Sequence, residues 1–184
     1  MPALTVTTRA ARPSDAEMMS RSLHIGLRTY RAFGPHAWDA PPFPDELEYS
    51  RERLRSRHTW GLIAEIAGEP AGHVAMYPDD RRDDTVYLWQ LFVRPPWWGT
   101  RLAQGLHDAF AHEALARGYR RGRLTTPAAH ARARRFYARQ GWRADGPPHE
   151  RWGVGMPLIE LHCRFRSLSA PADLAPVRGE DDNR

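Results

Sequence analysis

The stretch LFVRPPWWGTRLAQGL, residues 91–106, decides the fold of this chain. Its first residues end an apolar run, 85–93, that is typical of a buried strand, and Pro95-Pro96 stop that strand. From Gly99 onward the apolar residues recur with helical spacing until Gly118. The stretch therefore predicts a strand, a short loop and a helix in direct succession.

A junction of this kind is suited to binding a phosphate. The first amides of a helix have no partner inside the helix, and they carry partial positive charge. Gly99 lets the backbone approach a ligand closely, and the small side chain of Ala103 allows close packing. An ordinary strand-to-helix turn has the same spacing, so the junction alone leaves both interpretations open.

A second informative stretch is HARARRFYARQGW, residues 130–142. It predicts a helix over 129–140 that places Phe136 and Tyr137 on its inner face and ends before Gly141. A tyrosine on an inner face is most often a core residue, but its hydroxyl needs a partner when it is buried.

The positive charge is concentrated around this second stretch. The chain has 27 basic and 22 acidic residues, a net charge of +5, yet no acid lies between Glu113 and Asp145. A run of one sign is suited to a phosphate-rich ligand, and a solvated surface is the plain alternative. All the basic residues are arginine, and the absence of lysine excludes Schiff-base chemistry and a P-loop.

Length and composition narrow the class of protein. The chain has 184 residues, 41% of them apolar, which predicts one domain over 1–166 and a disordered tail over 167–184. It has no apolar run long enough for a membrane span and no signal-peptide pattern, so we expect a cytoplasmic protein without a membrane partner. The single cysteine, Cys163, is expected in the core. His107 and His112, five residues apart, are expected at the surface rather than on a metal.

The remaining elements complete a mixed α and β pattern. The first helix is expected from Ser14, as N-cap with Glu17 as its capping partner, to near Gly34. Residues 34–44 are rich in proline and aromatic residues and are expected to be irregular. Further strands are expected at 4–9, 60–66, 71–77, 122–126, 142–144 and 158–165, and a further helix at 45–58.

Together, residues 98–103 and 130–142 resemble two motifs of the GNAT superfamily of N-acetyltransferases, a likeness that extends over about residues 5–165. The later motif, Asn-x-x-Ala-x-x-Phe-Tyr-x-x-x-Gly-Phe, is matched in register by Ala133, Phe136, Tyr137 and Gly141, with His130 in place of the asparagine. The cofactor motif, [Gln/Arg]-x-x-Gly-x-[Gly/Ala], is matched less closely, because Trp98 and Arg101 depart from it.

The resemblance implies an α+β fold. This GNAT fold has a mixed, mostly antiparallel sheet of six to seven strands, about four flanking helices and a V-shaped opening between two parallel central strands. It implies acetyl-CoA as co-substrate and no metal. The implied cofactor-binding residues are Leu91, Phe92, Val93, Trp98, Gly99, Thr100, Arg101, Leu102, Ala103, His130, Ala133, Phe136, Tyr137 and Arg139. Among them, backbone groups of 91–93 would pair with the pantetheine arm, and amides of 99–103 would hold the pyrophosphate.

The resemblance also implies direct attack of an amine on the thioester, with Tyr137 donating a proton to the departing thiolate. The base stays open, because the strand 85–93 contains neither an acid nor a histidine, and Gln90 can only orient a water. His73, His149 and Glu150 are the nearest alternatives, beside a chain of water molecules. The acceptor pocket is expected to involve His36, Trp38, Phe43, Gln90, His149 and Trp152.

Two functions stay open at this point. The first is an acetyl-CoA-dependent N-acetyltransferase that acts on a primary amine of a small molecule or a protein, and the Phe136-Tyr137 pair favours it. The second is a non-catalytic GNAT-fold protein that binds acyl-CoA or nucleic acid, which the altered motif residues favour. Nucleic acid is the less expected partner, because aromatic residues are not interleaved with the arginines. The identity of the amine and the formation of a homodimer are left open.

Overall fold

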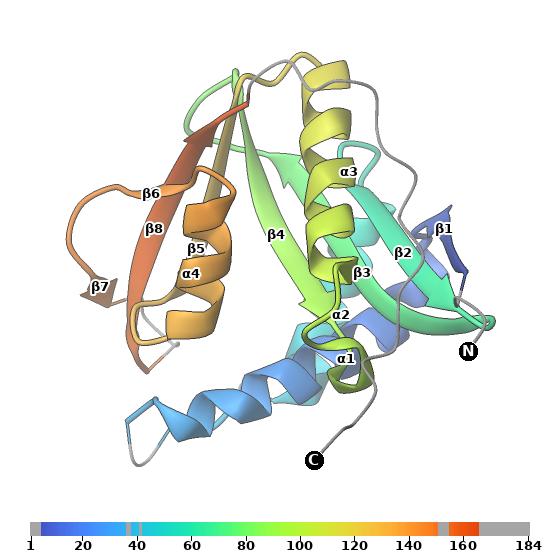
Figure 1. Cartoon of the computed structure of the whole chain (residues 1–184), viewed down its shortest axis with the longest axis horizontal. Coiled ribbons are helices and arrows are strands. Elements are labelled where there is room, and N and C mark those ends of the chain that lie inside the picture. The colour runs from blue at the N-terminus through green and yellow to red at the C-terminus, as the bar shows by residue number, and fades with distance from the viewer. Residues whose placement is uncertain (1–4, 36–37, 41, 151–154, 166–184) are drawn as a thin grey trace.

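The computed structural model describes residues 5–35, 38–40, 42–150 and 155–165, and these residues form one mixed sheet with α-helices on both faces (Figure 1). The helices are α1 (Ala16–Arg28), α2 (Phe43–Arg55), α3 (Leu102–Ala116) and α4 (Ala131–Arg139). The strands are β1 (Val6–Ala10), β2 (Trp60–Ile66), β3 (Glu69–Pro78), β4 (Thr85–Val93), β5 (Arg121–Pro127), β6 (Arg143–Ala144), β7 (His149–Glu150) and β8 (Pro157–Arg164). Short 3₁₀ turns lie at η1 (Pro13–Asp15), η2 (Thr29–Ala32) and η3 (Pro95–Trp97).

The strand order explains how the sheet comes to be open at its centre. The order is β1-β2-β3-β4-β5-β8-β6, and β7 pairs with β8. Among these described strands only β4 and β5 are parallel, and their pairing runs from Thr85↔Arg121 to Tyr87↔Arg123. Beyond Tyr87 the two strands diverge, as Figure 1 shows. The mostly antiparallel sheet and the V-shaped opening that the resemblance implies are thus confirmed, although the described residues form eight strands rather than six to seven.

A bulge in β4 accounts for the divergence. Ala75 of β3 pairs with Gln90, but the next residue, Met76, pairs with Leu88, so Trp89 is an extra residue on β4. A β-bulge bends its strand and increases the local twist. The bend follows directly after the paired segment, so it turns the second half of β4 away from β5.

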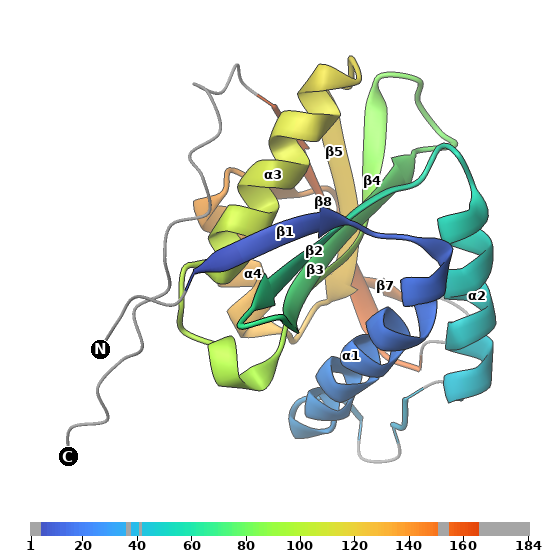
Figure 2. The ribbon, with the colours of Figure 1, turned by 90° about the vertical axis from the view of Figure 1, so that its right-hand side faces the viewer.

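The helices cover the two faces unequally. Figure 2 shows α1 and α2 on one face of the sheet and α3 and α4 on the other. The core lies mainly under α3, where Leu102, Leu106 and Phe110 are at most 1% exposed and pack against β3, β4 and β5. Burial of three such side chains contributes several kcal/mol, at about 1.5–3 kcal/mol each.

Several element boundaries differ from those predicted, among them the starts of three helices. The N-cap of α1 is Asp15 rather than Ser14, because Ser14 lies inside the 3₁₀ turn η1 that precedes the helix. Helix α2 begins at Phe43, since a proline is tolerated in the first turn of a helix. Helix α3 begins at Leu102 rather than at Gly99, because Gly99 has a φ of 84°, which is incompatible with a helix.

Two further expectations have definite outcomes. Cys163 is buried, as predicted. His107 was expected at the surface, and this was wrong: it is 5% exposed, and its Nε2 accepts a hydrogen bond from the indole of Trp142 at 2.9 Å. Its partner lies 35 residues away, so the local sequence gives no sign of it.

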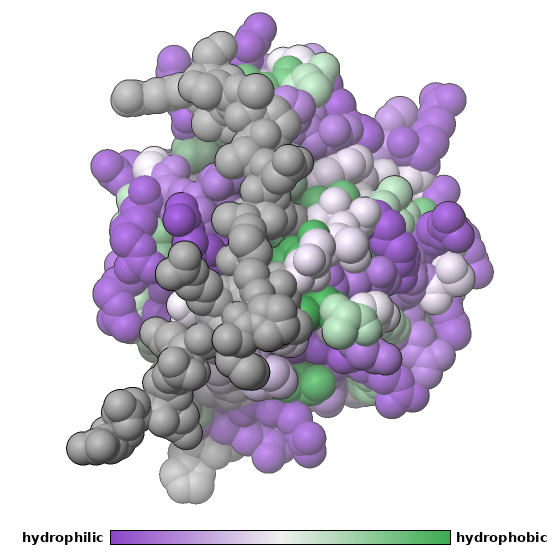
Figure 3. Space-filling view, turned by 45° about the vertical axis from the view of Figure 1, so that its right-hand side comes forward, coloured by the Kyte–Doolittle hydropathy of each residue, from purple (hydrophilic) through white to green (hydrophobic). Residues whose placement is uncertain are grey.

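The face drawn in Figure 3 is mostly hydrophilic, with a few apolar residues among the polar ones. Among all the described residues, the large apolar side chains that are exposed are Ile25, Tyr49 and Trp98. Within the described part of the chain, no helix combines the length and the apolar character needed to cross a bilayer.

Candidate active site

The divergence of β4 and β5 opens a cavity of about 980 Å³. Its wall is built by α1 and η2, the end of β4, the turn before α3 and the start of α4. Its size lies in the range of pockets for cofactor-sized ligands. The predicted cofactor-binding residues that line it are Leu91, Phe92, Val93, Trp98, Gly99, Thr100, Arg101, Ala103, His130, Ala133, Phe136, Tyr137 and Arg139. Leu102 does not line it, because its side chain is 1% exposed and faces the core.

Unpaired amides face this cavity at the start of α3. The first main-chain bond of the helix runs from the Gly105 amide to the Arg101 carbonyl at 3.0 Å. The Leu102 amide is satisfied by the Thr100 hydroxyl at 3.3 Å. Within the described chain the amides of Arg101, Ala103 and Gln104 have no partner, and all three residues line the cavity. They form the anion-binding end of a helix.

Trp98, which stands where the resemblance expects Gln or Arg, closes one side of this region. Its indole Nε1 donates a hydrogen bond to the carbonyl of Val93 at 2.6 Å. The neighbouring Arg94 amide bonds to Ala71 on β3, so by alternation the Val93 carbonyl faces the open side of β4. Trp98 therefore occupies one of the backbone groups that the resemblance assigns to the pantetheine arm.

Several arginines of the positively charged stretch between Glu113 and Asp145 are neutralised by ion pairs. Arg117 pairs with Glu113 at 2.7 Å, and Arg121 pairs with Asp84 at 3.0 Å. Arg101, Arg132 and Arg139 are exposed, line the cavity and form no ion pair within the described residues. Fewer arginines are thus free to bind an anionic ligand than the sequence run contains, and these three line the cavity.

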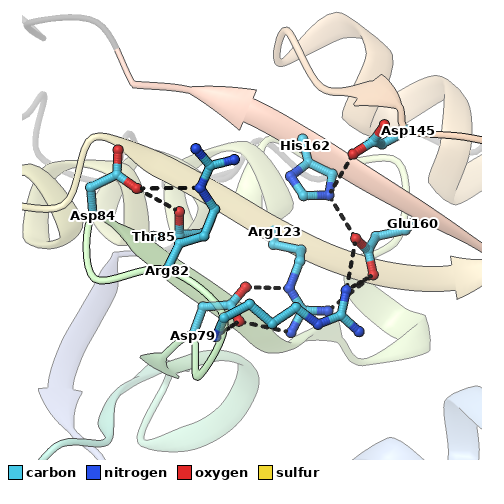
Figure 4. Close-up of polar contacts among 9 residues, drawn as sticks. Asp79, Arg82, Asp84, Thr85, Arg123, Asp145, Glu160 and His162 are labelled. Atoms are coloured by element: carbon cyan, nitrogen blue, oxygen red, sulfur yellow. Dashed lines mark hydrogen bonds and ion pairs between the residues drawn. The ribbon is translucent and has the colours of Figure 1, made fainter.

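Arg123 joins three strands at the closed end of the opening (Figure 4). From β5 its guanidinium pairs with Asp79, which follows β3, and with Glu160 on β8 at 3.1 Å. Glu160 also accepts a hydrogen bond from Arg81 at 3.1 Å, and its other oxygen lies 2.8 Å from Nε2 of His162. Burial alone would raise the pKa of the Asp79 carboxyl, but the Arg123 guanidinium holds that pKa below its ordinary value.

Tyr137 reaches the same cavity from α4. Its side chain is held by edge-to-face ring contacts with Phe136 at 5.3 Å and with Trp142 at 5.7 Å. Its hydroxyl has no hydrogen-bond partner within the described residues. Burial raises the pKa of this hydroxyl above its ordinary value of 10, so the group is fully protonated at neutral pH.

An aromatic group closes the cavity on the side of η2. The ring of His130 stacks on Phe33 at 5.0 Å and meets Tyr30 edge-on at 5.1 Å, and Tyr30 in turn contacts Trp38 at 5.7 Å. Burial lowers the pKa of His130, and the nearby Arg132 lowers it further. His130, which replaces the asparagine of the motif, is therefore a neutral aromatic ring in the cavity wall at physiological pH.

Sequence comparison identifies the family from these same segments. Residues 25–142, which include both motif stretches and the cavity wall between them, match the acetyltransferase (GNAT) family. The chain belongs to the GNAT acetyltransferase family. No protein with a curated description matches it by sequence.

Solved GNAT structures share the fold at low sequence identity. A GNAT acetyltransferase from Staphylococcus aureus superposes with a TM-score of 0.68 at 15% identity, over 88% of this chain and 100% of that one. The PaiA N-acetyltransferase from Thermoplasma acidophilum, solved in complex with coenzyme A, superposes with a TM-score of 0.67 at 14% identity, over 88% of this chain and 99% of that one. An acetyltransferase from Thermus thermophilus superposes with a TM-score of 0.68 at 20% identity, over 89% of this chain and 99% of that one.

The residues predicted as bases lie outside the GNAT cavity. His73 is 1% exposed, its Nε2 lies 2.9 Å from the amide oxygen of Gln90, and its Nδ1 has no partner. Burial lowers the pKa of His73 to about 4, so taking up a proton would be costly there. Glu150 and His149 form the exposed strand β7. These placements argue against His73 and leave the other two without a cavity contact.

The predicted acceptor residues are also spread out. Phe43 packs between His24 and Arg21 rather than along the cavity, and Trp38 is buried with Met156 and Leu158. Gln90 is 4% exposed beneath the cavity wall. His36 and Trp152 lie outside the described residues, so their predicted role stays untested.

Sequence reasoning missed other residues that build the site. Leu23, Leu27 and Tyr30, which carry no motif in the sequence, line the cavity. Helical periodicity identifies the inward face of α1 but cannot distinguish a core from a cavity. Glu46 of α2 contacts Gln90, and nothing in its local sequence marks it as part of a site.

Proposed function

We propose that this chain transfers an acetyl group from acetyl-CoA to a primary amine of a small molecule or a protein. The observation that carries the proposal is that one cavity is lined both by residues with unpaired helix amides and by Tyr137. Membership of the GNAT acetyltransferase family supports the transfer of an acyl group. A GNAT neighbour in complex with coenzyme A supports binding of a CoA thioester.

The residues present fit such a ligand. The amides of Arg101, Ala103 and Gln104 would hold the pyrophosphate at the start of α3, where the helix dipole favours negative charge. Arg101 lines the same cavity, so its guanidinium would pair with a phosphate rather than block it. The edge of β4 at 91–93 faces the opening, so the pantetheine arm would lie there as an added strand.

To catalyse the transfer, the protein must chiefly position the two reactants and transfer protons. The amine nitrogen attacks the thioester carbonyl carbon, a C–N bond forms, and the C–S bond breaks. Tyr137 would donate its proton to the leaving thiolate, for which a buried, protonated phenol is a suitable acid. The nitrogen must lose a proton at the same time, and a separate group has to receive it.

The direct test has two stages. Calorimetry with the full chain and acetyl-CoA should show one site per chain, and a free-thiol assay over a panel of primary amines should then show release of CoA. No heat at millimolar acetyl-CoA would overturn the proposal. Binding without thiol release across small amines and peptide N-termini would favour the non-catalytic CoA-binding protein instead.

A further inference from the structure

A chain of polar side chains connects β4 to α2 beside the cavity. Gln90 lies two residues before Phe92, whose side chain lines the cavity, so both point to the face covered by α1 and α2. The amide nitrogen of Gln90 lies 3.4 Å from Oε1 of Glu46, and its amide oxygen lies 2.9 Å from Nε2 of His73. The three residues come from α2, β3 and β4 and meet where β4 bulges.

The hydrogen bonds present Glu46 as an acceptor. The Gln90 amide donates to Glu46 and accepts from the Nε2–H of neutral His73, and the Ser50 hydroxyl donates to the same Oε1 at 3.1 Å. This pattern suits a carboxylate, which only accepts. Within the described residues Oε2 of Glu46 has no partner, and the side chain is only partly buried. One carboxylate oxygen is therefore free to accept a proton.

Other carboxylates near this face are poorly suited to the task. Asp79 and Glu160 are both ion-paired with Arg123, and each has a pKa below its ordinary value although burial opposes that shift. Glu46 forms no ion pair within the described chain. Burial raises the pKa of Glu46, against the opposing effect of the Ser50 hydrogen bond. A raised pKa makes a carboxylate a better base near neutral pH.

The inference rests on the function proposed above, which sets where the thioester lies. If the phosphates sit at the start of α3 and the arm runs back along 93–91, the thioester reaches the bulge of β4 at 89–90. Gln90 lies there, with Glu46 bound to its amide. We propose that Glu46 is the catalytic base of the transfer and that Gln90 is the residue that positions it.

The step balances without any further reactant. The amine nitrogen forms its bond to the acetyl carbon while one of its protons passes to Oε2 of Glu46. The C–S bond breaks, and the thiolate receives the proton of Tyr137. Afterwards the Glu46 acid gives up its proton and the tyrosinate regains one, both through solvent, so the net products are the N-acetyl amine and CoA thiol.

The test is Glu46→Gln, which keeps the shape and the polar contacts of the side chain but removes its basicity. At pH 7 the variant should lose about 10²–10⁴-fold in kcat, with the Kd for acetyl-CoA unchanged. Glu48→Gln is the matched control: Glu48 lies on the same helix, is exposed and pairs with Arg51. It should retain the wild-type rate. Glu46→Asp should recover part of the activity, because it keeps a carboxylate.

A pH profile separates a base from a merely structural residue. The rate of the wild type should fall as the pH drops through the raised pKa of Glu46, and this limb should vanish in Glu46→Gln. The groups facing Glu46 are Ser50 from its own helix, Gln90 from β4 and neutral His73 behind it. On the α1 side, Arg21 and His24 face Phe43, which lies one turn earlier.

The outcomes distinguish this inference from the proposed function. A wild type that neither binds acetyl-CoA nor releases thiol refutes the function itself. A wild type that transfers acetyl groups, with Glu46→Gln equally fast, refutes only the role of Glu46. A slow variant that keeps the wild-type acidic limb, or that also loses acetyl-CoA binding and melts earlier, refutes it as well, since Glu46 would then be structural.

Discussion

The guanidinium of Arg132 lies 4.6 Å from the centre of the Trp98 ring. The contact links the turn before α3 to the start of α4, across the region where both residues line the cavity. Such cation–π contacts contribute about 0.5–1 kcal/mol when exposed. Trp98 is thereby held in the position in which its indole nitrogen donates to the carbonyl of Val93.

This arrangement predicts that Trp98 competes with the ligand for one backbone group. Trp98→Phe keeps a ring under Arg132 but removes the donor, so the Val93 carbonyl becomes available. The Kd for acetyl-CoA should fall about threefold to tenfold, the equivalent of one net hydrogen bond. Trp97→Phe, in which the neighbouring ring forms no such bond, is the control and should stay within about twofold. Weaker binding by Trp98→Phe in calorimetry would contradict the prediction.

Arg101 should assist binding of the phosphates. Arg101→Ala removes a cation from the wall of the cavity that the unpaired amides also line, and the Kd for acetyl-CoA should rise about tenfold. Acetyl-pantetheine, which lacks the pyrophosphate, should bind almost as before. Arg135→Ala is the matched control, because Arg135 is exposed on α4 outside the cavity. Equal loss for both ligands would assign Arg101 a general role in folding instead.

Tyr137→Phe should lower kcat by about 10²–10⁴-fold without destabilising the protein. The hydroxyl has no partner within the described residues, so its removal costs no internal hydrogen bond, while the ring contacts with Phe136 and Trp142 remain. Because burial raises the pKa of Tyr137, wild-type activity should show no loss of this acid up to about pH 10. Tyr119→Phe, at a ring outside the cavity, serves as control. A retained kcat with a lower Tm would mark the hydroxyl as structural.

Arg123 should matter for stability far more than its neighbour Arg81. Arg123→Met leaves the buried Asp79 carboxylate without its partner, which costs about 3–5 kcal/mol in free energy of unfolding. Arg81→Met removes an exposed partner of Glu160 and should cost less than about 1 kcal/mol. Urea unfolding of both variants measures the difference. Adding Asp79→Asn to Arg123→Met should restore part of the loss, and equal effects of the two arginines would be inconsistent with this account.

His73 should make the fold sensitive to mild acid. Its pKa is lowered from 6.5 to about 4, so the unfolded chain binds the proton more readily than the native state. The corresponding stability is complete above pH 6.5 and is lost as the pH falls toward 4. Between pH 7 and pH 5 this one group should cost about 2 kcal/mol. In His73→Gln the urea-derived free energy should depend less on pH over that interval, and an unchanged dependence would rule His73 out.

Periodicity and motif spacing were enough to predict the order of the main elements and most of the cavity wall. The repeats around Leu102 and Tyr137 are local properties of the chain, and local patterns specify helices and strands directly. The short strand β7 was missed, because its two residues form a strand only by pairing with β8. Gln90 was expected to orient a water, and its contact with Glu46 was not foreseen.

The electrostatics of the site could not be predicted in the same way. Arg123 looked like one member of a free positive run, yet its partners Asp79 and Glu160 lie 44 and 37 residues away in sequence. His73 is a possible base by its sequence position, but it lies buried in the sheet. The charge and basicity of a side chain depend on which groups the fold brings near it and on its burial. Neither can be derived from the residues next to it in sequence.

The unfilled edge of β4 makes the molecule an incomplete sheet. Backbone groups beyond Tyr87 that would otherwise bond to β5 remain available to an added strand-like ligand. A ligand that pairs with this edge would bind the native state and not the unfolded chain. Its binding would therefore raise the free energy of unfolding. If the chain binds acetyl-CoA as proposed, its resistance to proteolysis should rise with the concentration of that ligand.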